Sequence, residues 1–415
     1  MRKKRIAIIG AGISGLTTAR ILKAKGYSPV IFEKESKPGG LIRCSEEEGN
    51  LFHHVGGIVF NTKIDKIKTW FQEQFDFENE FIPARRNAKI LYNDQYIGYP
   101  VENYLYQLPD GFYGKIIKEL ALKAWNSNHV SNFEDFLRKK FGETLFELYF
   151  RPYNEKIWNF DLKMMPLSWL EGKLPMPDFK EIVISNLLKR PEKKMVHSTF
   201  LYPRKGGSSF IANRLAEGTH IVFNTGIDQI KKSGDQWFIR EDLFDAVVYT
   251  GDVRKLAHLL KEVPHGITEC TEKVKDLPSN GTSNVLCYTD DSDLSWLYIP
   301  GQEYRCHRIV YTGNMSPANN SKERKTCLVE FSGNVEKETI NEQLRLLPGN
   351  MVPIAYNHEP SSYVIQLHDT RNRIAMLKRQ LEPLDFYLVG RFAEWEYYNM
   401  DMAMLSAMNV CNRFF

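Results

Sequence analysis

The sequence lacks most of the features that assign a chain to a class at sight. Its 415 residues include no apolar run near the roughly 20 residues needed to span a membrane. The net charge of +4 is too small to argue for a nucleic-acid partner. No C-x-x-C pair or internal repeat is present, and six cysteines are scattered along the chain: Cys44, Cys270, Cys287, Cys306, Cys327 and Cys411. We therefore expect a cytoplasmic protein with reduced thiols and with no metal site, membrane segment or nucleic-acid partner.

The composition is that of a globular protein large enough for more than one domain. Hydrophobic residues make up 43% of the chain and charged residues 26%, both ordinary proportions. The basic start, residues 1–5, runs directly into an apolar segment without a cleavage site. We interpret it as a solvated lead-in and not as a targeting segment.

The first forty residues contain a dinucleotide-binding fingerprint. A short apolar run at residues 5–9 predicts a buried strand, and residues 16–25 have helical apolar spacing. Between them, Gly10 permits a tight turn, Gly12 lets a pyrophosphate approach the backbone, and Gly15 brings helix and strand together. The start of that helix, with Ser14, offers free N–H groups to the pyrophosphate. Glu33 ends the second predicted strand and is placed to accept a bond from a ribose hydroxyl.

A second glycine pair extends this fingerprint. Gly39 and Gly40 follow Glu33 and Lys34 in an E-x5-G-G pattern, which accompanies FAD in the flavoproteins with two dinucleotide folds. The segment 52–60, which contains Gly57 and Ile58, could lie against the isoalloxazine ring. We predict FAD as the cofactor.

The rest of the chain predicts a cofactor domain built from three separated stretches. We expect an α/β (α+β) fold in which a Rossmann-like FAD-binding domain carries a helical insertion and a mainly antiparallel β-sheet substrate layer. The predicted limits are 1–85, 196–265 and 376–415 for the FAD domain, 86–195 for the mostly helical cap, and 266–375 for the β layer.

Three segments carry a resemblance to a known family. Residues 151–161 are similar to a G-Y-T-x-K-Q-W-x-x-D segment, and residues 87–100 to a hairpin that ends in a hydrophobic-Pro pair. Residues 390–401 are similar to G-R-x-x-x-Y-x-Y-x-D-M-D. All three patterns belong to the UDP-galactopyranose mutases, within the superfamily of FAD-dependent amine oxidases and protoporphyrinogen oxidases. The resemblance spans nearly the whole chain.

The resemblance implies roles for individual residues. Arg308 and Tyr397 would act at the reacting centre, where Arg308 clamps a phosphate and Tyr397 reaches the diphosphate of the substrate. Tyr153 and Trp158 would contact a uridine-type base. The cofactor would be held by Gly10, Gly12, Ser14, Gly15, Glu33, Lys34, Gly39, Gly40, Gly57, Ile58, Ile227, Gly390, Arg391, Asn399 and Met400. In the implied reaction, N5 of reduced FAD attacks the anomeric carbon of a nucleotide sugar, and the sugar recloses with the other ring size.

Two positions depart from the family pattern. The mutases usually have His where Ile58 stands, and Arg where Pro177 ends the run of residues 174–177. Lys173, Lys180 or Arg204 could replace the missing arginine. The first hypothesis for function is a nucleotide-sugar mutase in surface polysaccharide synthesis, for which both a monomer and a homodimer are open. An FAD-dependent oxidoreductase of amine oxidase or protoporphyrinogen oxidase type is the second hypothesis, and a flavin-binding protein without turnover is the third.

Overall fold

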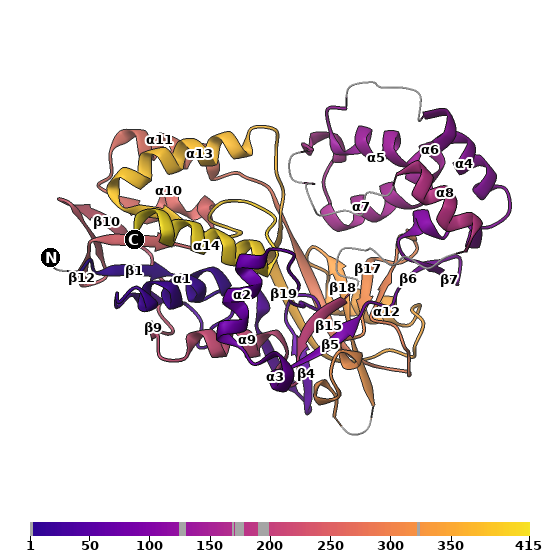
Figure 1. Cartoon of the computed structure of the whole chain (residues 1–415), viewed down its shortest axis with the longest axis horizontal. Coiled ribbons are helices and arrows are strands. Elements are labelled where there is room, and N and C mark those ends of the chain that lie inside the picture. The colour runs from indigo at the N-terminus through magenta and orange to yellow at the C-terminus, as the bar shows by residue number, and fades with distance from the viewer. Residues whose placement is uncertain (1–2, 124–129, 168–169, 171–177, 190–198, 322–323) are drawn as a thin grey trace.

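The protein is described by a computed structural model that covers residues 3–123, 130–167, 170, 178–189, 199–321 and 324–415. Figure 1 shows a five-stranded sheet with its helices at one end and a seven-stranded sheet with a group of helices at the other. No helix among these residues is long and apolar enough to cross a membrane.

The five-stranded sheet is parallel and is assembled from three distant parts of the chain. Its order is β20 (Phe386–Leu388), β13 (Ala246–Tyr249), β1 (Ile6–Ile9), β2 (Val30–Phe32) and β9 (His220–Val222). Buried parallel strands need apolar side chains on both faces, and β1 satisfies this with Ile6 and Ile8 on one face and Ala7 on the other.

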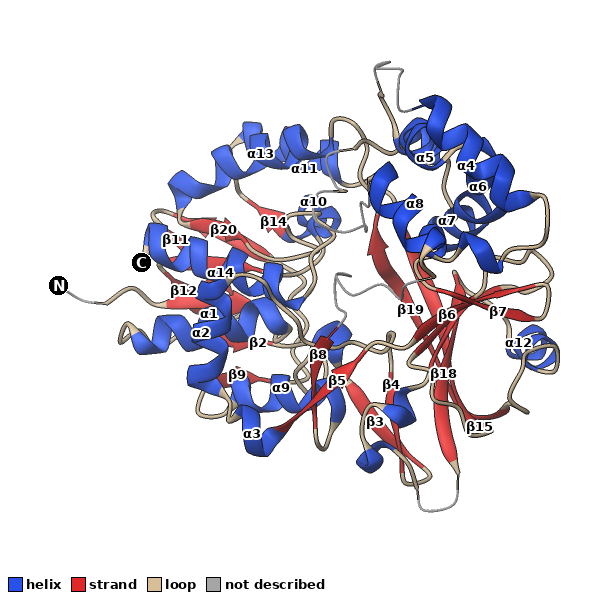
Figure 2. Ribbon diagram, turned by 45° about the vertical axis from the view of Figure 1, so that its right-hand side comes forward, coloured by secondary structure: helices blue, strands red, loops and turns tan. Residues whose placement is uncertain are grey.

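Helices cover both faces of this sheet (Figure 2). The Ile8 face packs against α1 (Ile13–Ala24), α2 (Asp65–Gln74), α9 (Gly207–Ala216) and α14 (Met400–Phe414). The Ala7 face packs against α10 (Leu256–Leu259), α11 (His265–Val274) and α13 (Thr370–Leu381). It also meets a four-stranded sheet in the order β12 (Asp242–Phe244), β11 (Gln236–Ile239), β10 (Ile230–Ser233) and β14 (Leu260–Lys261). This arrangement leaves the carboxyl ends of β1, β2 and β13 beside the fingerprint loop.

The second large sheet has seven strands and is mainly antiparallel. Its order is β19 (Val352–Val364), β15 (Ser279–Thr289), β18 (Lys325–Ser332), β17 (Cys306–Val310), β16 (Trp296–Tyr298), β6 (Ala88–Tyr92) and β7 (Gln95–Gly98). The β16–β6 pair alone is parallel among its pairings. Side chains alternate along β15: Val285 and Cys287 face α12 (Lys337–Leu344), whereas Leu286 faces the helical group.

The helical group lies above this sheet (Figure 1). It comprises α4 (Phe112–Lys123), α5 (Phe133–Phe141), α6 (Glu143–Leu145), the π-helical turn η4 (Phe146–Phe150), α7 (Arg151–Trp158) and α8 (Phe179–Leu187). Its apolar core continues into the sheet through Leu286, Trp296 and Val310. The β6–β7 hairpin precedes this group in the chain, and Asn93 and Asp94 form its turn with φ of 45° and 61°.

Two small sheets and a short helix connect the large units. One sheet pairs β3 (Cys44–Glu47) with β4 (Asn50–His53), and the other pairs β5 (Phe81–Arg85) with β8 (Thr199–Pro203). The helix α3 (Phe77–Glu80) precedes β5.

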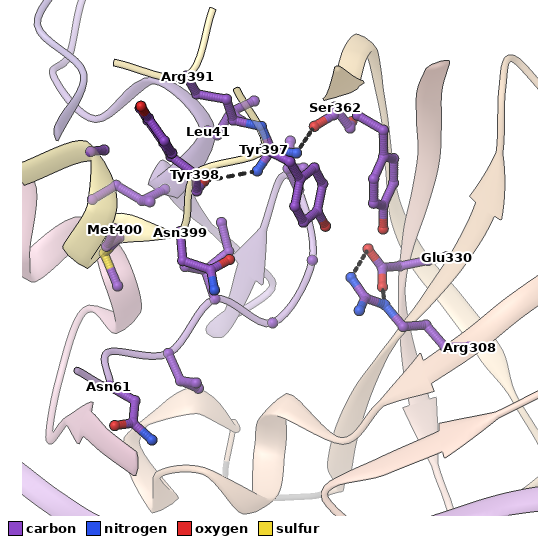
Figure 3. A pocket seen from close by; sticks show the side chains of 18 of the residues that line it. Leu41, Asn61, Arg308, Glu330, Ser362, Arg391, Tyr397, Tyr398, Asn399 and Met400 are labelled. Carbon is purple, nitrogen blue, oxygen red and sulfur yellow. Dashed lines mark hydrogen bonds and ion pairs between the residues drawn. The ribbon is translucent and has the colours of Figure 1, made fainter. Parts of the chain in front are cut away.

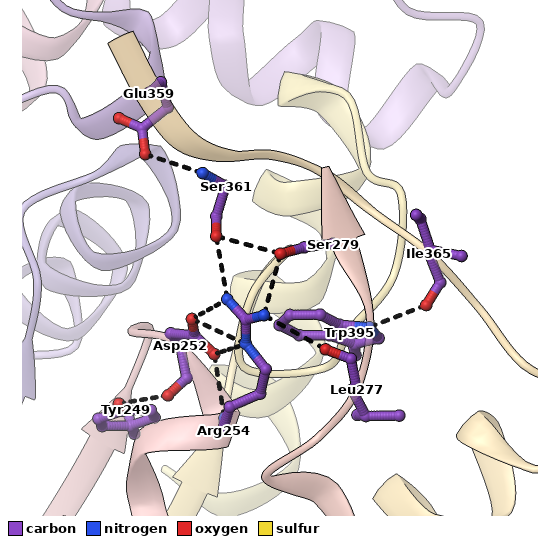
Figure 4. Close-up of polar contacts among 9 residues, drawn as sticks. All are labelled: Tyr249, Asp252, Arg254, Leu277, Ser279, Glu359, Ser361, Ile365 and Trp395. Carbon is purple, nitrogen blue, oxygen red and sulfur yellow. Dashed lines mark hydrogen bonds and ion pairs between the residues drawn. The ribbon is translucent and has the colours of Figure 1, made fainter. Parts of the chain in front are cut away.

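An arginine-centred contact, shown in Figure 4, ties the two large sheets together. Arg254 follows β13 and forms an ion pair with Asp252 at 2.7 Å. Its guanidinium also donates to Ser279 at the start of β15 and to Ser361 in β19, both at 2.9 Å. It stacks over Trp395 at 4.6 Å. The contact therefore joins the seven-stranded sheet to the five-stranded sheet.

The predicted fold class is confirmed, including the Rossmann-like part, the helical insertion and the mainly antiparallel second sheet. The domain limits stay a prediction. The hairpin of residues 88–98, which falls within the predicted helical stretch, completes the seven-stranded sheet.

Candidate functional site

A cavity of about 250 Å³ lies where the two large sheets and the start of α14 meet. Figure 3 shows charged and aromatic side chains converging on it from distant segments. The lining residues are Leu41, Ile42, Val55, Gly56, Gly57, Ile58, Val59, Asn61, Arg86, Trp296, Arg308, Glu330, Ser362, Tyr363, Arg391, Tyr397, Tyr398, Asn399, Met400 and Ala403. Seven of the predicted site residues are therefore brought together: Gly57, Ile58, Arg308, Arg391, Tyr397, Asn399 and Met400.

The three fingerprint glycines occupy different environments. Gly10 has φ of +103°, a backbone conformation that favours glycine. A Cβ on Gly15 would lie 2.0 Å from the Gly10 carbonyl oxygen, so Gly15 is required by the packing of helix against turn. A Cβ on Gly12 would meet no atom within 4 Å. Gly12 therefore leaves open the space that a pyrophosphate needs at the start of α1.

Glu33, the predicted contact of a ribose hydroxyl, lies beside the fingerprint loop. Glu33 is buried, and its two carboxylate oxygens accept bonds from the backbone N–H groups of Ala11 at 2.7 Å and Glu35 at 2.9 Å. Each carboxylate oxygen has a second lone pair, so Glu33 can still accept a ribose hydroxyl. Gly39 donates to the carbonyl of Ala11 at 2.8 Å, which holds the second glycine pair against the fingerprint.

The other predicted cofactor residues differ in how close they come to these elements. A Cβ on Gly40 would lie 3.4 Å from the Cα of Gly12, and one on Gly390 would lie 2.0 Å from the Ser14 hydroxyl. The Gly12, Gly40, Ser14 and Gly390 positions thus form one backbone cradle. Lys34 has an exposed side chain that pairs with Glu35 at 3.5 Å. Ile227 is partly buried and packs on the Ala7 face of the five-stranded sheet.

The loop of residues 55–59 forms one wall of the cavity. A Cβ on Gly56 would lie about 3 Å from both Glu330 and Arg308, and one on Gly57 would lie 2.3 Å from Val310. Ile58 is partly buried among apolar residues of the nucleotide-binding part. At the position where the mutases usually have His, this chain thus supplies an aliphatic side chain.

Arg308 and Glu330 form an ion pair across the neighbouring strands β17 and β18 (Figure 3). Glu330 is 1% exposed, whereas a quarter of the Arg308 side chain is exposed. The carboxylate therefore holds the guanidinium in place while part of that guanidinium faces the cavity.

Arg391 is held beside the start of α14. Its guanidinium donates to the backbone carbonyls of Tyr398, at 3.2 Å, and of Ser362, and it stacks on the Tyr397 ring at 4.2 Å. Its Nε is buried and has no hydrogen-bond partner among the described residues. A phosphate oxygen would satisfy that donor, which fits the predicted pyrophosphate contact.

Tyr397 belongs to an aromatic group that includes two predicted substrate residues. Its ring stacks on Tyr363 at 5.8 Å, and Trp158 meets both rings edge-on at 5.6 Å. Tyr153 contacts Tyr298 at 5.5 Å. Neither Tyr153 nor Trp158 is among the residues that line the cavity; they support its wall from α7. Burial raises the pKa of Tyr363 and of Tyr153, so both phenols stay neutral near pH 7.

A buried cysteine and histidine lie beside the cavity. The thiol of Cys44 is 3.4 Å from Nδ1 of His53, whose Nε2 is 2.7 Å from the Tyr202 hydroxyl. Burial alone would raise the pKa of Cys44, but the charge and hydrogen bond of His53, with bonds from Ser208 and Ser209, lower that pKa to about 7. No group of three or more metal-binding side chains occurs among the described residues.

Sequence reasoning missed several residues of the cavity, above all Arg86, Trp296, Glu330, Ser362 and Tyr363. Glu330 interrupts the otherwise apolar run of residues 327–331 in β18, and that charge within the run was the available signal. Arg86 sits between two strands with no motif around it. Of the proposed replacements for the missing arginine, Lys180 is exposed on α8, and Arg204 donates to the Glu78 carbonyl at 3.0 Å outside the cavity wall. Pro177 and Lys173 lie outside the described residues.

Comparisons with known proteins place this fold and site in a class. A model of NAD(P)-binding Rossmann-like domains matches residues 8–73. The chain is 25% identical over 185 residues to a probable UDP-galactopyranose mutase of Klebsiella pneumoniae, and this match covers 42% of the chain and 46% of that protein. It therefore spans less than half of the Klebsiella protein. Protoporphyrinogen oxidases are also among the similar proteins and structures.

The likeness to mutases extends over the whole chain in two further comparisons. Identity to the dTDP-fucopyranose mutase of Escherichia coli is 21% over 415 residues, which cover 97% of this chain and 96% of that one. The crystal structure of reduced UDP-galactopyranose mutase superposes with a TM-score of 0.89 at 21% identity, covering 99% of this chain and 95% of that chain.

The class defined here is the Rossmann-type fold that UDP-galactopyranose mutase shares with protoporphyrinogen oxidases. Within it, the predicted resemblance to UDP-galactopyranose mutase is confirmed. The comparisons also confirm the prediction of an enzyme. Flavin-containing monooxygenases are among the similar proteins, which supports a flavin as the cofactor.

Proposed function

We propose that this protein binds FAD and interconverts the pyranose and furanose forms of a nucleotide sugar in surface polysaccharide synthesis. The observation that carries the proposal is the single cavity that collects Arg308, Tyr397 and Arg391 at the start of α14. The full-length similarity to two nucleotide-sugar mutases supports it. The six cysteines are free and buried, which fits the cytoplasmic location we propose.

The residues of the site fit FAD. The adenosine ribose would lie at Glu33, and the pyrophosphate would lie at Gly12, the start of α1 and the unpartnered Nε of Arg391. The flavin ring would lie between the 55–59 loop and the start of α14. When bound and reduced, the flavin supplies a nucleophilic N5 to the anomeric carbon.

The side chains of the cavity would bind and orient the substrate. Arg308, held by Glu330, presents a guanidinium to a phosphate of the nucleoside diphosphate, and Tyr397 offers its hydroxyl to the same group. The neutral phenol of Tyr363 adds a hydrogen-bonding group without adding negative charge. The sugar is thereby positioned while its leaving diphosphate is stabilised.

A titration of the yellow protein with UDP tests the proposal. Flavin absorbance and fluorescence would be followed in the oxidised and in the dithionite-reduced protein, and NMR would identify any product formed from UDP-galactose. We expect binding in the reduced state and ring interconversion without net redox change. Absence of any spectral change with UDP or UDP-sugars would exclude the mutase function.

The second candidate is an FAD-dependent oxidoreductase. It is favoured by the similarity to protoporphyrinogen oxidases and by Ile58, which makes one cavity wall more apolar than that of the mutases. Consumption of O2 or another acceptor with an amine or porphyrinogen would identify this activity, because a mutase consumes none.

A further inference from the structure

Arg86 contributes a cation to the cavity that belongs to none of the motifs described above. It stands in the connection between β5 and β6 and lines the same cavity as Arg308 and Arg391. The neighbouring Arg85 is exposed. Two adjacent arginines thus differ completely in environment, and only Arg86 faces the site.

Aromatic rings hold the Arg86 guanidinium in place. Its central carbon lies 4.9 Å from the centre of the Trp296 ring, 5.2 Å from that of Tyr99 and 5.6 Å from that of Tyr298. One of its nitrogens donates to the Tyr298 hydroxyl. Ring faces attract a cation and fix its plane, but they supply no negative charge to neutralise it.

The charge of Arg86 is not compensated within the described part of the chain. No carboxylate there forms an ion pair with it, and its buried Nε has no hydrogen-bond partner. Burial, followed by the nearby Arg308 charge, lowers the pKa of Arg86, whereas Tyr99 acts in the opposite sense. By contrast, Arg308 has Glu330, and Arg391 has two backbone carbonyls. A partly buried guanidinium with no anion beside it is unfavourable, so a ligand that supplies an anion gains affinity.

We propose that Arg86, held in the cage of Tyr99, Trp296 and Tyr298, is a second phosphate-binding cation of the substrate pocket and acts with Arg308 on a nucleoside diphosphate. This inference rests on the proposed function and specifies how the substrate anion is bound. Two guanidinium groups on one cavity match the two phosphates of such a ligand.

Binding of UDP, uridine and inorganic pyrophosphate to the reduced holoprotein tests this inference. The variants are Arg86→Gln, Arg86→Lys and, as a matched control, Arg85→Gln. We expect Arg86→Gln to weaken UDP binding by about 10- to 100-fold, the range for losing one charge-assisted bond, and to change uridine binding less than twofold. Arg86→Lys keeps the charge without the planar fork and should recover part of the affinity. Arg85→Gln should behave as wild type.

The outcomes separate this inference from the proposed function. UDP affinity of Arg86→Gln within twofold of wild type, in a protein whose flavin spectrum and melting temperature are unchanged, would overturn the role of Arg86. An equal loss of uridine and UDP binding would also overturn it, because it would indicate a general effect on pocket shape. If the wild-type protein binds no UDP, the proposed function fails, and the pyrophosphate measurement then tests Arg86 separately. Pyrophosphate binding by wild type that is lost in Arg86→Gln would support the anion site at Arg86. Absence of pyrophosphate binding by wild type would refute that site.

Discussion

Replacing Gly12 by Ala should strongly weaken flavin binding without harming the fold. Gly12 has φ of −75° and ψ of 179°, a conformation open to any residue, and a Cβ there meets no protein atom within 4 Å. Ala in place of Gly lowers the entropy of the unfolded chain but is a poorer N-cap, so we expect apoprotein stability within about 1 kcal/mol of wild type. The added methyl instead occupies the space of the pyrophosphate. Displacing that group from two charge-assisted hydrogen bonds, at about 1.5–3 kcal/mol each, weakens flavin affinity by about 10²- to 10⁴-fold.

Gly15→Ala, three residues later, should have the opposite effect, because it should destabilise the fold. Its Cβ would lie 2.0 Å from a backbone oxygen, and 3.2 Å from the Ile8 side chain, so Gly15→Ala must displace α1 from β1. We expect it to lower stability by about 1–3 kcal/mol or more. Gly114→Ala, in the exposed first turn of α4, is the control that should not lower stability, because its Cβ meets no atom and Ala favours the helix. Urea unfolding of the apoproteins and titration with FAD measure the two effects separately. Wild-type FAD affinity in Gly12→Ala would refute the reasoning, as would a loss of stability equal to that of Gly15→Ala.

Three further predictions concern buried charges. Glu330→Ala leaves Arg308 without its partner and should lower the free energy of unfolding, measured in urea, by about 3–5 kcal/mol. A Glu330→Leu/Arg308→Met double variant should recover much of that loss. An effect of the single variant below about 1 kcal/mol would contradict the pairing. The Cys44 thiolate should absorb at 240 nm with a titration midpoint near pH 7, and the Cys44→Ser variant should lack this transition. The pKa of Cys44 in the folded protein lies below its ordinary value of 9.0. The stability that the thiolate contributes is therefore present above pH 9 and is lost as the pH falls through about 7. Arg254→Met should cost at least about 1.5–3 kcal/mol through its lost charged bonds, whereas exposed Lys255→Met should stay within about 0.5 kcal/mol; equal effects would argue against the contact between the sheets.

The part of the site formed by the glycine fingerprint and Glu33 could be predicted from the sequence because its geometry depends on local spacing. Gly10, Gly12 and Gly15 act within one turn of chain, and Glu33 follows the next strand, so a linear pattern captures their geometry. Gly390 and Arg391 were found through the family resemblance. Gly390 lies against Ser14, and Arg391 lines the cavity. Both positions depend on the strand order, in which β20 lies two strands from β1.

The substrate half could be predicted only in part because it is built from long-range pairings. Glu330 meets Arg308 through the register of β17 and β18, and Arg86 meets Trp296 beside the parallel β16–β6 pair. Nothing local to residues 86 or 330 encodes these registers. Trp158 illustrates the reverse case: its motif is clear, but its side chain supports Tyr363 and Tyr397 and does not itself line the cavity.

The titratable residues of the cavity favour chemistry that needs no protein base. Among the described lining residues, Glu330 is the one carboxylate, and histidine, lysine and cysteine do not occur. Glu330 is paired with Arg308, so using it to take a proton would leave that guanidinium unpaired next to Arg86. A reaction in which the protein binds a diphosphate and the cofactor provides the nucleophile requires only the cations and neutral phenols that are present. The mutase reaction meets this condition, whereas a reaction limited by proton abstraction does not.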